Sequence, residues 1–280
     1  MSGLNAPIPS ATPVIRPTEA ERIDVRGLSK SFQIAGAAIE AVRDVSFSVR
    51  RGEFVALLGP SGSGKSTILN MIATLVRPSS GQILIDGGPV IAGKATPNVG
   101  YIFQRDTLFP WRTVAGNIGY GLELAGVPDA ERRERVAACV DQAGLGGFER
   151  AYPSALSGGM RQRAALMRAL VVEPQILLMD EPFGALDTHT KIDMHEVLLR
   201  IWDREQQTVL FVTHDLGEAL TLADRIILFS ARPGCIKDMF AVDFPRPRDT
   251  VKVRETPRYA ELFQHIWHSL GEEFVKERSR

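Results

Sequence analysis

The sequence predicts an α/β fold built around a mainly parallel central sheet. Two observations carry this prediction: short, wholly apolar runs recur along the chain, and helical stretches separate them. A run without polar residues is typical of a strand that is buried on both faces of a parallel sheet. Strands that alternate with helices are the pattern of α/β proteins. With 280 residues, the chain can bury a substantial core in one large domain.

The N-terminal segment 1–22 is rich in proline, alanine, serine and threonine, and we expect it to be a disordered tail. It lacks the basic-then-apolar order of a secretory signal. No apolar run in the chain approaches the ~18 residues that a membrane-spanning helix needs. We therefore expect a protein that is soluble by itself and that depends on another protein for any position at a membrane.

Two segments near the start, Ile23–Arg26 and Val45–Val49, alternate apolar and polar residues, which predicts half-buried strands. Phe54–Leu58 is wholly apolar and predicts the first buried strand. Apolar residues then recur at helical spacing over 68–76, so the glycine-rich segment before them joins a strand to a helix. Gln82–Gly87 predicts a strand that enters a turn.

Strand patterns disappear from Trp111 to about Gly147, and Asp129–Gln142 predicts a charged amphipathic helix. Ile176–Met179 and Val209–Val212 then predict two more buried strands. We therefore expect the helical stretch between the strands to be an inserted subdomain.

Three regions follow from these elements. The main domain spans 23–250, and the inserted helical subdomain covers about 106–165 of it. The last segment, 251–280, predicts a helix that is capped by Thr256 and opened by Pro257. We expect this helix to pack on the flank of the domain rather than to bind a partner.

The composition argues against some classes of function. The 33 basic residues balance the 33 acidic ones, whereas phosphate contacts usually leave a nucleic-acid-binding protein with a basic surplus. The two cysteines, Cys139 and Cys235, match no metal or redox spacing and indicate ordinary thiols in a reducing cytoplasm. Four histidines without ligand spacing lie on predicted helices and are expected at the surface: His189, His195, His265 and His268.

The glycine-rich segment fits the phosphate-loop pattern at every fixed position. Glycines let the backbone wrap around phosphates with its N–H groups pointing inward, and the following helix adds the positive end of its dipole. We expect Lys65 to bind the β and γ phosphates and the Ser66 hydroxyl to bind Mg²⁺. The expected nucleotide-binding residues are Gly59, Pro60, Ser61, Gly62, Ser63, Gly64, Lys65, Ser66 and Thr67.

Two acidic residues, Asp180 and Glu181, follow the buried run 176–179. A strand end places Asp180 beside the metal, where it can hold Mg²⁺ directly or through water. Glu181 is the expected general base for the water that attacks the γ phosphate. An acidic pair at a strand end is usually only solvated, and the upstream phosphate loop is what favours catalysis.

The segment Leu156–Arg163 resembles the signature sequence of the ATP-binding cassette (ABC) ATPases. The likeness runs from about Ile23 to Asp243. It implies a P-loop NTPase core of the RecA-like type, with an N-terminal antiparallel β-subdomain and the inserted helical subdomain. A helix N-terminus with glycines is an anion site, and one triphosphate can use both it and the phosphate loop only between two subunits. The residues expected to act on the partner's nucleotide are Ser157, Gly158 and Gly159.

The resemblance also assigns single residues. Phe32 stands where the family has an aromatic residue that stacks on adenine, although a core phenylalanine is the alternative. Gln104 matches the glutamine that responds to Mg²⁺ and to the transporter, and Asp187 lies in the dimer-contact loop. His214 matches the histidine that senses the γ phosphate, and we count it with Glu181 as catalytic.

Three large apolar residues follow Gln104 in a proline-bearing loop: Leu108, Phe109 and Trp111. They either fill the joint between subdomains or form a groove for a partner's helix. The resemblance favours the groove, where a coupling helix of a membrane subunit would dock.

This loop, together with Asn117 and the segment 231–234, resembles importer ATPases of the nitrate, sulfonate and taurine type, and of related systems for pyrimidine precursors. The resemblance implies a peripheral ATPase at the cytoplasmic face of the cell (inner) membrane, with ATP and Mg²⁺ as cofactors. Its partners would be a second copy or a paired ABC subunit, transmembrane permease subunits and, indirectly, a periplasmic solute-binding protein. Because the solute does not touch this subunit, the sequence does not identify it.

Two alternatives stay open. One is an ABC ATPase that acts on nucleic acid or the ribosome. ABC ATPases that act on nucleic acid carry long coiled coils between the phosphate loop and the signature. Those that act on the ribosome carry two cassettes in one chain. The other is an exporter ATPase, which is normally fused to membrane helices. None of these features is present in the sequence.

Overall fold

The computed structural model describes residues 21–34, 36–96, 98–105, 107–184 and 186–278. Most of the expected N-terminal tail, residues 1–20, lies outside the described residues. Strand β1 (Glu21–Ile34) already begins at Glu21, so the expected tail boundary at residue 22 is wrong by two residues. The reason is local pairing: Glu21 lies opposite Arg50 of the next strand, and the buried Arg22 forms an ion pair with Asp86 at 2.8 Å.

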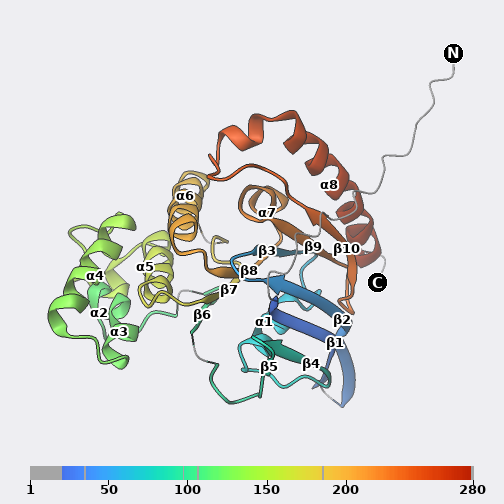
Figure 1. Cartoon of the computed structure of the whole chain (residues 1–280), viewed down its shortest axis with the longest axis horizontal. Helices are drawn as coiled ribbons and strands as arrows, with labels where there is room; N and C mark the ends of the chain where they lie inside the picture. The colour runs from blue at the N-terminus through green and yellow to red at the C-terminus, as the bar shows by residue number, and fades with distance from the viewer. Residues whose placement is uncertain (1–20, 35, 97, 106, 185, 279–280) are drawn as a thin grey trace.

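The central sheet has six strands in the order β10-β9-β3-β8-β7-β6 (Figure 1). All neighbouring strands are parallel except β9 and β10, which run antiparallel. The strands are β3 (Phe54–Leu58), β6 (Val99–Ile102), β7 (Ile176–Asp180), β8 (Thr208–Thr213), β9 (Arg225–Phe229) and β10 (Ile236–Ala241). Every residue of β3, β7 and β8 is buried, which confirms the three strands predicted from wholly apolar runs.

A second sheet of four strands is antiparallel throughout, in the order β2-β1-β4-β5. It contains β1, β2 (Ala37–Arg50), β4 (Ser80–Ile85) and β5 (Gly88–Pro89). This sheet and α1 (Lys65–Ile72) lie on one face of the central sheet (Figure 1). The expected α/β fold with an N-terminal antiparallel β-region is therefore confirmed.

Side chains of β3 alternate between two hydrophobic cores. Phe54, Ala56 and Leu58 enter a core shared with α5 to α8, whereas Val55 and Leu57 enter a core shared with α1 and the antiparallel sheet. The central sheet is thus covered on both faces, as a parallel sheet requires.

The helices between β6 and β7 gather at one side of the molecule, green to yellow in Figure 1. They are α2 (Val114–Ile118), α3 (Tyr120–Leu124), α4 (Asp129–Gln142), the short 3₁₀ helix η1 (Pro153–Ala155) and α5 (Gly158–Leu170). The helix predicted at Asp129–Gln142 has those bounds. Two further helices flank the sheet after β7 and β8: α6 (Thr188–Glu205) and α7 (Leu216–Leu222).

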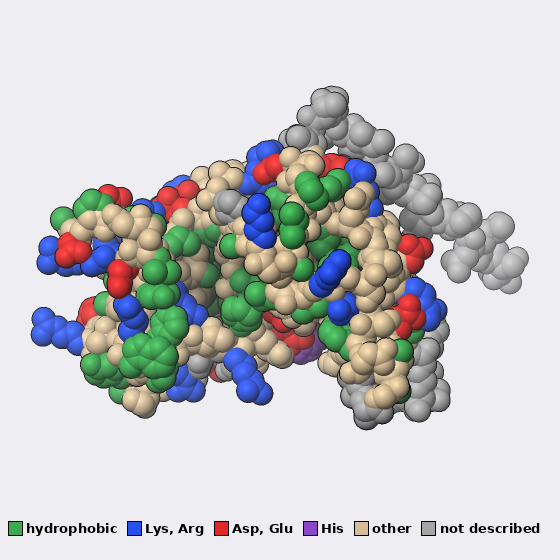
Figure 2. Space-filling model, turned by 90° about the horizontal axis from the view of Figure 1, so that it is seen from below, with side chains coloured by type: hydrophobic (Ala, Val, Ile, Leu, Met, Phe, Trp, Pro, Cys, Tyr) green, Lys and Arg blue, Asp and Glu red, His purple; other side chains and the backbone are tan. Residues whose placement is uncertain are grey.

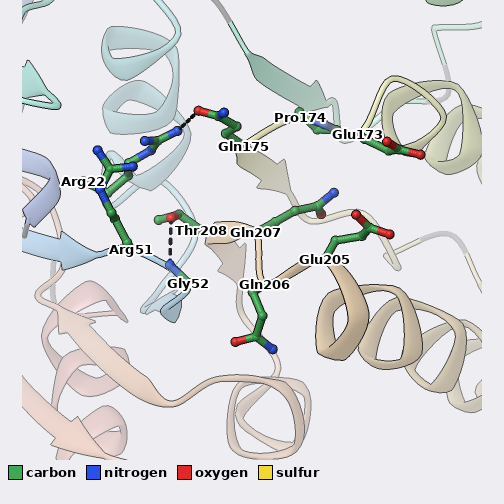
Figure 3. Close-up of a pocket in the computed structure, with 10 residues that line it drawn as sticks. All are labelled: Arg22, Arg51, Gly52, Glu173, Pro174, Gln175, Glu205, Gln206, Gln207 and Thr208. Atoms are coloured by element: carbon green, nitrogen blue, oxygen red, sulfur yellow. Dashed lines mark hydrogen bonds between the residues drawn. The ribbon is translucent and has the colours of Figure 1, made fainter. Parts of the chain in front are cut away.

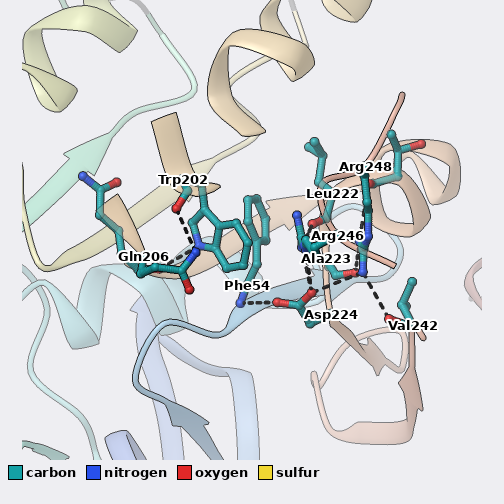
Figure 4. Close-up of polar contacts among 11 residues, drawn as sticks. Phe54, Trp202, Gln206, Leu222, Ala223, Asp224, Val242, Arg246 and Arg248 are labelled. Atoms are coloured by element: carbon teal, nitrogen blue, oxygen red, sulfur yellow. Dashed lines mark hydrogen bonds and ion pairs between the residues drawn. The ribbon is translucent and has the colours of Figure 1, made fainter. Parts of the chain in front are cut away.

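The segment after β10 is fixed to the core by arginines around one carboxylate (Figure 4). Asp224 accepts hydrogen bonds from the backbone N–H of Phe54 at 3.0 Å, from Arg246 at 2.7 Å and from Arg248 at 3.2 Å. The Arg246 guanidinium also lies over the Trp202 ring, 4.1 Å from its centroid. These contacts direct the chain toward its last helix.

That helix is α8 (Pro257–Arg278), preceded by the 3₁₀ helix η2 (Lys252–Glu255). The Thr256 hydroxyl accepts a hydrogen bond from the Tyr259 N–H at 3.2 Å, as the sequence predicts for an N-cap. Leu262, Ile266 and Leu270, spaced four residues apart, are buried in the core. In the part of the chain that the structure describes, no helix combines the length and the apolar character that a membrane crossing requires.

Candidate active site

The phosphate loop connects the end of β3 to the start of α1, which is the strand-to-helix junction predicted from the sequence. Gly64 adopts a φ of 83°, in the region that favours glycine. A methyl group on Gly64 would also lie 2.6 Å from the carbonyl oxygen of Ala41 and 2.6 Å from the Val42 side chain. The loop therefore needs glycine here both for its backbone conformation and for close packing against β2.

The ammonium of Lys65 lies inside the loop. Lys65 is only 4% exposed, and its Nζ donates hydrogen bonds to the carbonyl oxygens of Gly59 at 2.8 Å and Pro60 at 2.7 Å and to the Ser63 hydroxyl at 3.0 Å. A cation enclosed by a glycine-rich loop at a helix N-terminus is the arrangement that binds phosphates.

Ser66 and Asp180 meet beside this loop. The Ser66 hydroxyl donates a hydrogen bond of 2.7 Å to Asp180 Oδ1, which joins the first turn of α1 to the end of β7. Burial raises the pKa of the Asp180 carboxyl, and the hydrogen bond from Ser66 opposes that rise. Two oxygen donors side by side are the ligand chemistry that Mg²⁺ prefers.

Glu181 is the meeting point of three strand ends. Its Oε2 accepts a hydrogen bond of 3.2 Å from Gln104 Nε2 and lies 3.1 Å from His214 Nδ1. Gln104 follows β6, Glu181 follows β7 and His214 follows β8. Because the carboxyl ends of neighbouring parallel strands lie at the same edge of the sheet, three residues far apart in the sequence converge. The structure thus brings together the two residues predicted to be catalytic.

The signature residues lie at the exposed N-terminus of α5. Ser157 is the N-cap, and its hydroxyl accepts a hydrogen bond from the Met160 N–H at 3.3 Å. Ser157 and Gly158 are exposed, whereas Gly159 is half-buried, and a methyl group on it would lie 3.5 Å from the Leu186 side chain. An exposed helix N-terminus is free to receive an anion from outside the molecule.

Asp187 and Phe32 have structural contacts of their own. Asp187 is the N-cap of α6, where its carboxylate accepts hydrogen bonds from the Thr190 N–H at 3.1 Å and the Thr190 hydroxyl at 2.6 Å. These bonds lower the pKa of the Asp187 carboxyl. Phe32 is half-buried on β1 against the core, with the Lys30 ammonium 5.0 Å from the centre of its ring.

The three apolar residues of the loop after Gln104 differ in their exposure. Leu108 is buried in the core, Phe109 is half-buried, and Trp111 is 71% exposed, with its ring 5.5 Å from that of Phe109. The fully buried Asn117 holds this loop: its amide accepts from the Phe109 N–H at 2.7 Å and donates to the carbonyls of Phe109 and Arg112 at 3.1 and 3.0 Å.

One histidine is not where the sequence places it. His195 was expected at the surface, but it is 1% exposed and packs edge-on against the Phe183 ring at 4.7 Å. Burial lowers the pKa of His195 to about 3, and the charges of Arg254 and Lys191 act in the same direction. The error is one of pattern reading: Leu198, Leu199 and Trp202 follow His195 by three, four and seven residues, a spacing that puts His195 on the buried face of α6.

A separate hollow of about 300 Å³ lies at the opposite edge of the sheet, where β3 and β8 begin (Figure 3). Its lining includes Arg22, Gly52 and Thr208, so it is distant from the strand ends that carry Asp180 and Glu181. Among the described residues, no group of three or more His, Cys, Asp or Glu side chains could hold a metal ion by itself.

Comparison with known proteins agrees with this geometry. The family described as ABC transporter matches residues 42–184, a segment that holds the phosphate loop, Gln104, the signature and Glu181. The chain belongs to this family. This ABC cassette therefore binds ATP and hydrolyses it, and the predicted resemblance is confirmed.

Similar proteins include importer subunits. The cassette is 42% identical to the nitrate import ATP-binding protein NrtD of Synechocystis sp. over 245 residues, which cover 87% of this chain and 91% of that protein. It is 40% identical to an aliphatic sulfonates import ATP-binding protein, SsuB of Bacillus cereus, over 254 residues that cover 91% and 96%.

Solved structures confirm the fold. The dimeric post-hydrolysis state of the ATP-binding cassette MJ0796, bound to ADP and Pi, superposes with a TM-score of 0.71 and 31% identity. The match covers 80% of this cassette and 100% of that chain.

Proposed function

We propose that this ABC cassette is the ATP-hydrolysing subunit of an importer. It forms a dimer around two Mg-ATP molecules and couples hydrolysis to transmembrane subunits that import a small solute of the nitrate, sulfonate or pyrimidine-precursor type. The proposal rests on one observation: the loop 104–113 connects the catalytic site to the surface. Gln104 at its start contacts Glu181, and Trp111 near its end is exposed. The names of two similar proteins, for nitrate and sulfonate import, support the direction of transport.

In this proposal Glu181 is the general base. It takes a proton from the attacking water, and His214 and Gln104 hold its Oε2 from two sides. Lys65 binds the β and γ phosphates once its ammonium exchanges loop carbonyl oxygens for phosphate oxygens. The rest of the loop, from Gly59 to Thr67, contributes backbone N–H groups, and Phe32 stacks on the base.

The residues present fit Mg²⁺. Ser66, Asp180 and Gln104 would hold it, since the hydroxyl of Ser66 and the carboxylate of Asp180 are already 2.7 Å apart. When bound, the ion would neutralise charge on the phosphates.

The signature residues complete the site of a second protomer. Ser157, Gly158 and Gly159 offer a helix N-terminus to the γ phosphate of the partner's ATP, and Asp187, the expected dimer-contact residue, follows Leu186, whose side chain packs against Gly159. Loss of the γ phosphate removes charge that both protomers bind, so the dimer loosens after hydrolysis. The similar cassette MJ0796 is dimeric with ADP and Pi, which supports this arrangement.

The helical subdomain, about 106–165, carries the partner surface. Hydrophobic side chains gather on this lobe, at the left of Figure 2. Its exposed large hydrophobic residues include Trp111, Leu124, Phe148 and Tyr152. Exposed apolar groups of this size favour contact with another protein. We place the cassette, peripherally bound, at the cytoplasmic face of the membrane, with a periplasmic solute-binding protein acting on the other side.

Affinity purification of the full chain from solubilised membranes, followed by mass spectrometry, tests this function. Capture of a polytopic membrane protein is the expected result, and its loss in the variant Trp111→Ala would place the contact on the loop. Capture of nucleic acid or ribosomes that nuclease releases would instead favour the alternative ABC function.

A further inference from the structure

We propose that Glu273, on the last helix, is a positioning residue for the phosphate loop and thereby sets the affinity for ATP. This inference rests only on the ATP binding of the family. It concerns a contact outside the phosphate loop, the strand ends and the signature.

The first link joins the phosphate loop to the turn between β9 and β10. A methyl group on Gly234 would lie 1.9 Å from the carbonyl oxygen of Ser63, so the two backbones are in direct contact. The turn is also bonded to β2: the Gly234 N–H donates to the Ala41 carbonyl at 2.9 Å, and the Arg43 N–H donates to the Gly234 carbonyl at 3.0 Å. The same Ala41 carbonyl packs against Gly64. The turn and β2 therefore enclose residues 63 and 64 of the loop.

The second link fixes the turn itself. The Ser230 hydroxyl lies 3.1 Å from the carbonyl oxygens of both Ala231 and Pro233, which share its one proton, and it accepts from the Cys235 N–H at 3.1 Å. The Ser230 N–H in turn donates to the Cys235 carbonyl at 2.9 Å. These bonds connect Ala231 to the residues on both sides of Gly234, so we expect a change at Ala231 to alter the position of Gly234.

The third link is Glu273. Its Oε2 accepts a hydrogen bond from the Ala231 N–H at 3.0 Å, and its Oε1 lies 3.0 Å from the ammonium of Lys237. Glu273 is 1% exposed. A buried carboxylate needs such partners, and its removal would leave the Ala231 N–H buried without an acceptor.

Helix α8 reaches a second element of the site. Its first half packs on α7, the helix that follows His214, and a methyl group on Gly217 of α7 would lie 3.4 Å from the Tyr259 hydroxyl. Its second half holds the turn through Glu273, beside β10 (Figure 1). Burial of Leu262, Ile266 and Leu270 keeps the helix in place between these contacts. One helix therefore supports both the phosphate loop and the helix after His214.

Glu272 provides a matched control. It is the neighbouring residue and also accepts a hydrogen bond from Lys237, at 2.7 Å, but its side chain is 54% exposed. The variant Glu272→Ala therefore removes one carboxylate of α8 that contacts Lys237. The hydrogen bond from the Ala231 N–H to Glu273 remains.

The test compares full-length Glu273→Ala, Glu273→Gln and Glu272→Ala by ATP titration and by hydrogen–deuterium exchange of peptides covering 59–66. We expect Glu273→Ala to raise the Kd for ATP about fivefold or more and to speed exchange in the loop. Glu273→Gln keeps an acceptor for Ala231 and should restore most of the affinity. Glu272→Ala should match the natural chain in both measurements.

A merely structural role would lower the melting temperature of Glu273→Ala but leave the Kd unchanged at temperatures well below melting. That result, with loop exchange equal to that of Glu272→Ala, would overturn the proposal. If Glu273→Ala does not fold, Glu273→Asp takes its place, because it keeps the charge but shortens the reach to Ala231. A natural ATP affinity in Glu273→Asp would equally overturn it.

Discussion

His214 Nδ1 lies 3.1 Å from Glu181 Oε2, the same oxygen that accepts a hydrogen bond from Gln104. One carboxylate oxygen is therefore held from the ends of β6 and β8, the two strands that flank β7. The other neighbour of the site, Asp180, is engaged with Ser66 instead. The two adjacent acidic residues thus have different partners. In the proposed mechanism Asp180 therefore holds the metal and Glu181 acts on water.

Replacing Glu181 by Gln should separate binding from hydrolysis. Glutamine has nearly the shape of glutamate but cannot accept a proton from water at neutral pH, so we expect ATP hydrolysis to slow at least ~10²-fold. ATP affinity should remain close to that of the natural chain, because Lys65 and Ser66 are unchanged. Phosphate release and nucleotide titration measure the two quantities. Unchanged turnover would assign the base to another residue.

Ser157→Arg should leave ATP binding intact and abolish hydrolysis, because the exposed helix N-terminus serves the partner's nucleotide. The substitution also removes the N-cap of α5, which costs about 1 kcal/mol of stability. Ser157→Ala loses the same cap without added bulk or charge, so it should match Ser157→Arg in melting temperature while losing less hydrolysis.

Mixing Ser157→Arg with Lys65→Ala tests the sharing of sites directly. Lys65→Ala alone should lose ATP binding, because the ammonium inside the loop is gone. A mixed dimer contains one intact phosphate loop facing one intact signature, so hydrolysis should partly return. A mixture that stays as inactive as its separate components would argue against a site built from two protomers.

The stability of the fold should depend on pH through His195. Its pKa is lowered to about 3 in the folded chain, whereas an unfolded histidine titrates near 6.5. Above pH 6.5 His195 is neutral in both the folded and the unfolded chain, so it does not change the free energy of unfolding. As the pH falls below 6.5 only the unfolded chain takes up the proton, so unfolding becomes easier.

The variant His195→Phe should remove the pH dependence of stability that His195 causes. Between pH 6.5 and pH 5 the natural chain should lose about 1.5 kcal/mol more of its free energy of unfolding than the variant does. Urea unfolding at several pH values measures the difference, and carboxylates common to both proteins cancel. Parallel pH profiles would show that His195 is protonated in the folded state.

The sequence predicted the strands whose burial is visible in their own composition. The apolar runs Phe54–Leu58 and Val209–Val212 lie in strands that are buried on both faces, so they contain no polar residue and the strands are visible in the sequence. Val99–Ile102 was not predicted as a strand, because it is short, contains a glycine and lies at the edge of the sheet.

The placement of Glu181 and His214 could be predicted because each follows a predicted strand and matches a family motif. Gln104 could be assigned only from the family motif, since the strand before it was not predicted. Glu273 could not be predicted in this way. Two consecutive glutamates near the end of a charged helix indicate a solvated face, and only Glu272 is exposed. The burial of Glu273 depends on the Ala231 N–H, 42 residues away, which a local pattern does not contain.

Trp111→Ala should separate coupling from hydrolysis. The indole is 71% exposed and contacts the Phe109 ring of its own loop, while the buried Asn117 keeps the loop backbone in place. We therefore expect the isolated variant to hydrolyse ATP at the natural rate and to melt at the natural temperature, but to retain little of the membrane partner in purification. Trp267→Ala, at an indole that is 54% exposed on α8, is the matched control and should retain that partner. Equal retention by both variants would remove the loop from the partner surface, and a lower melting temperature for Trp111→Ala would mean that the indole supports the fold instead.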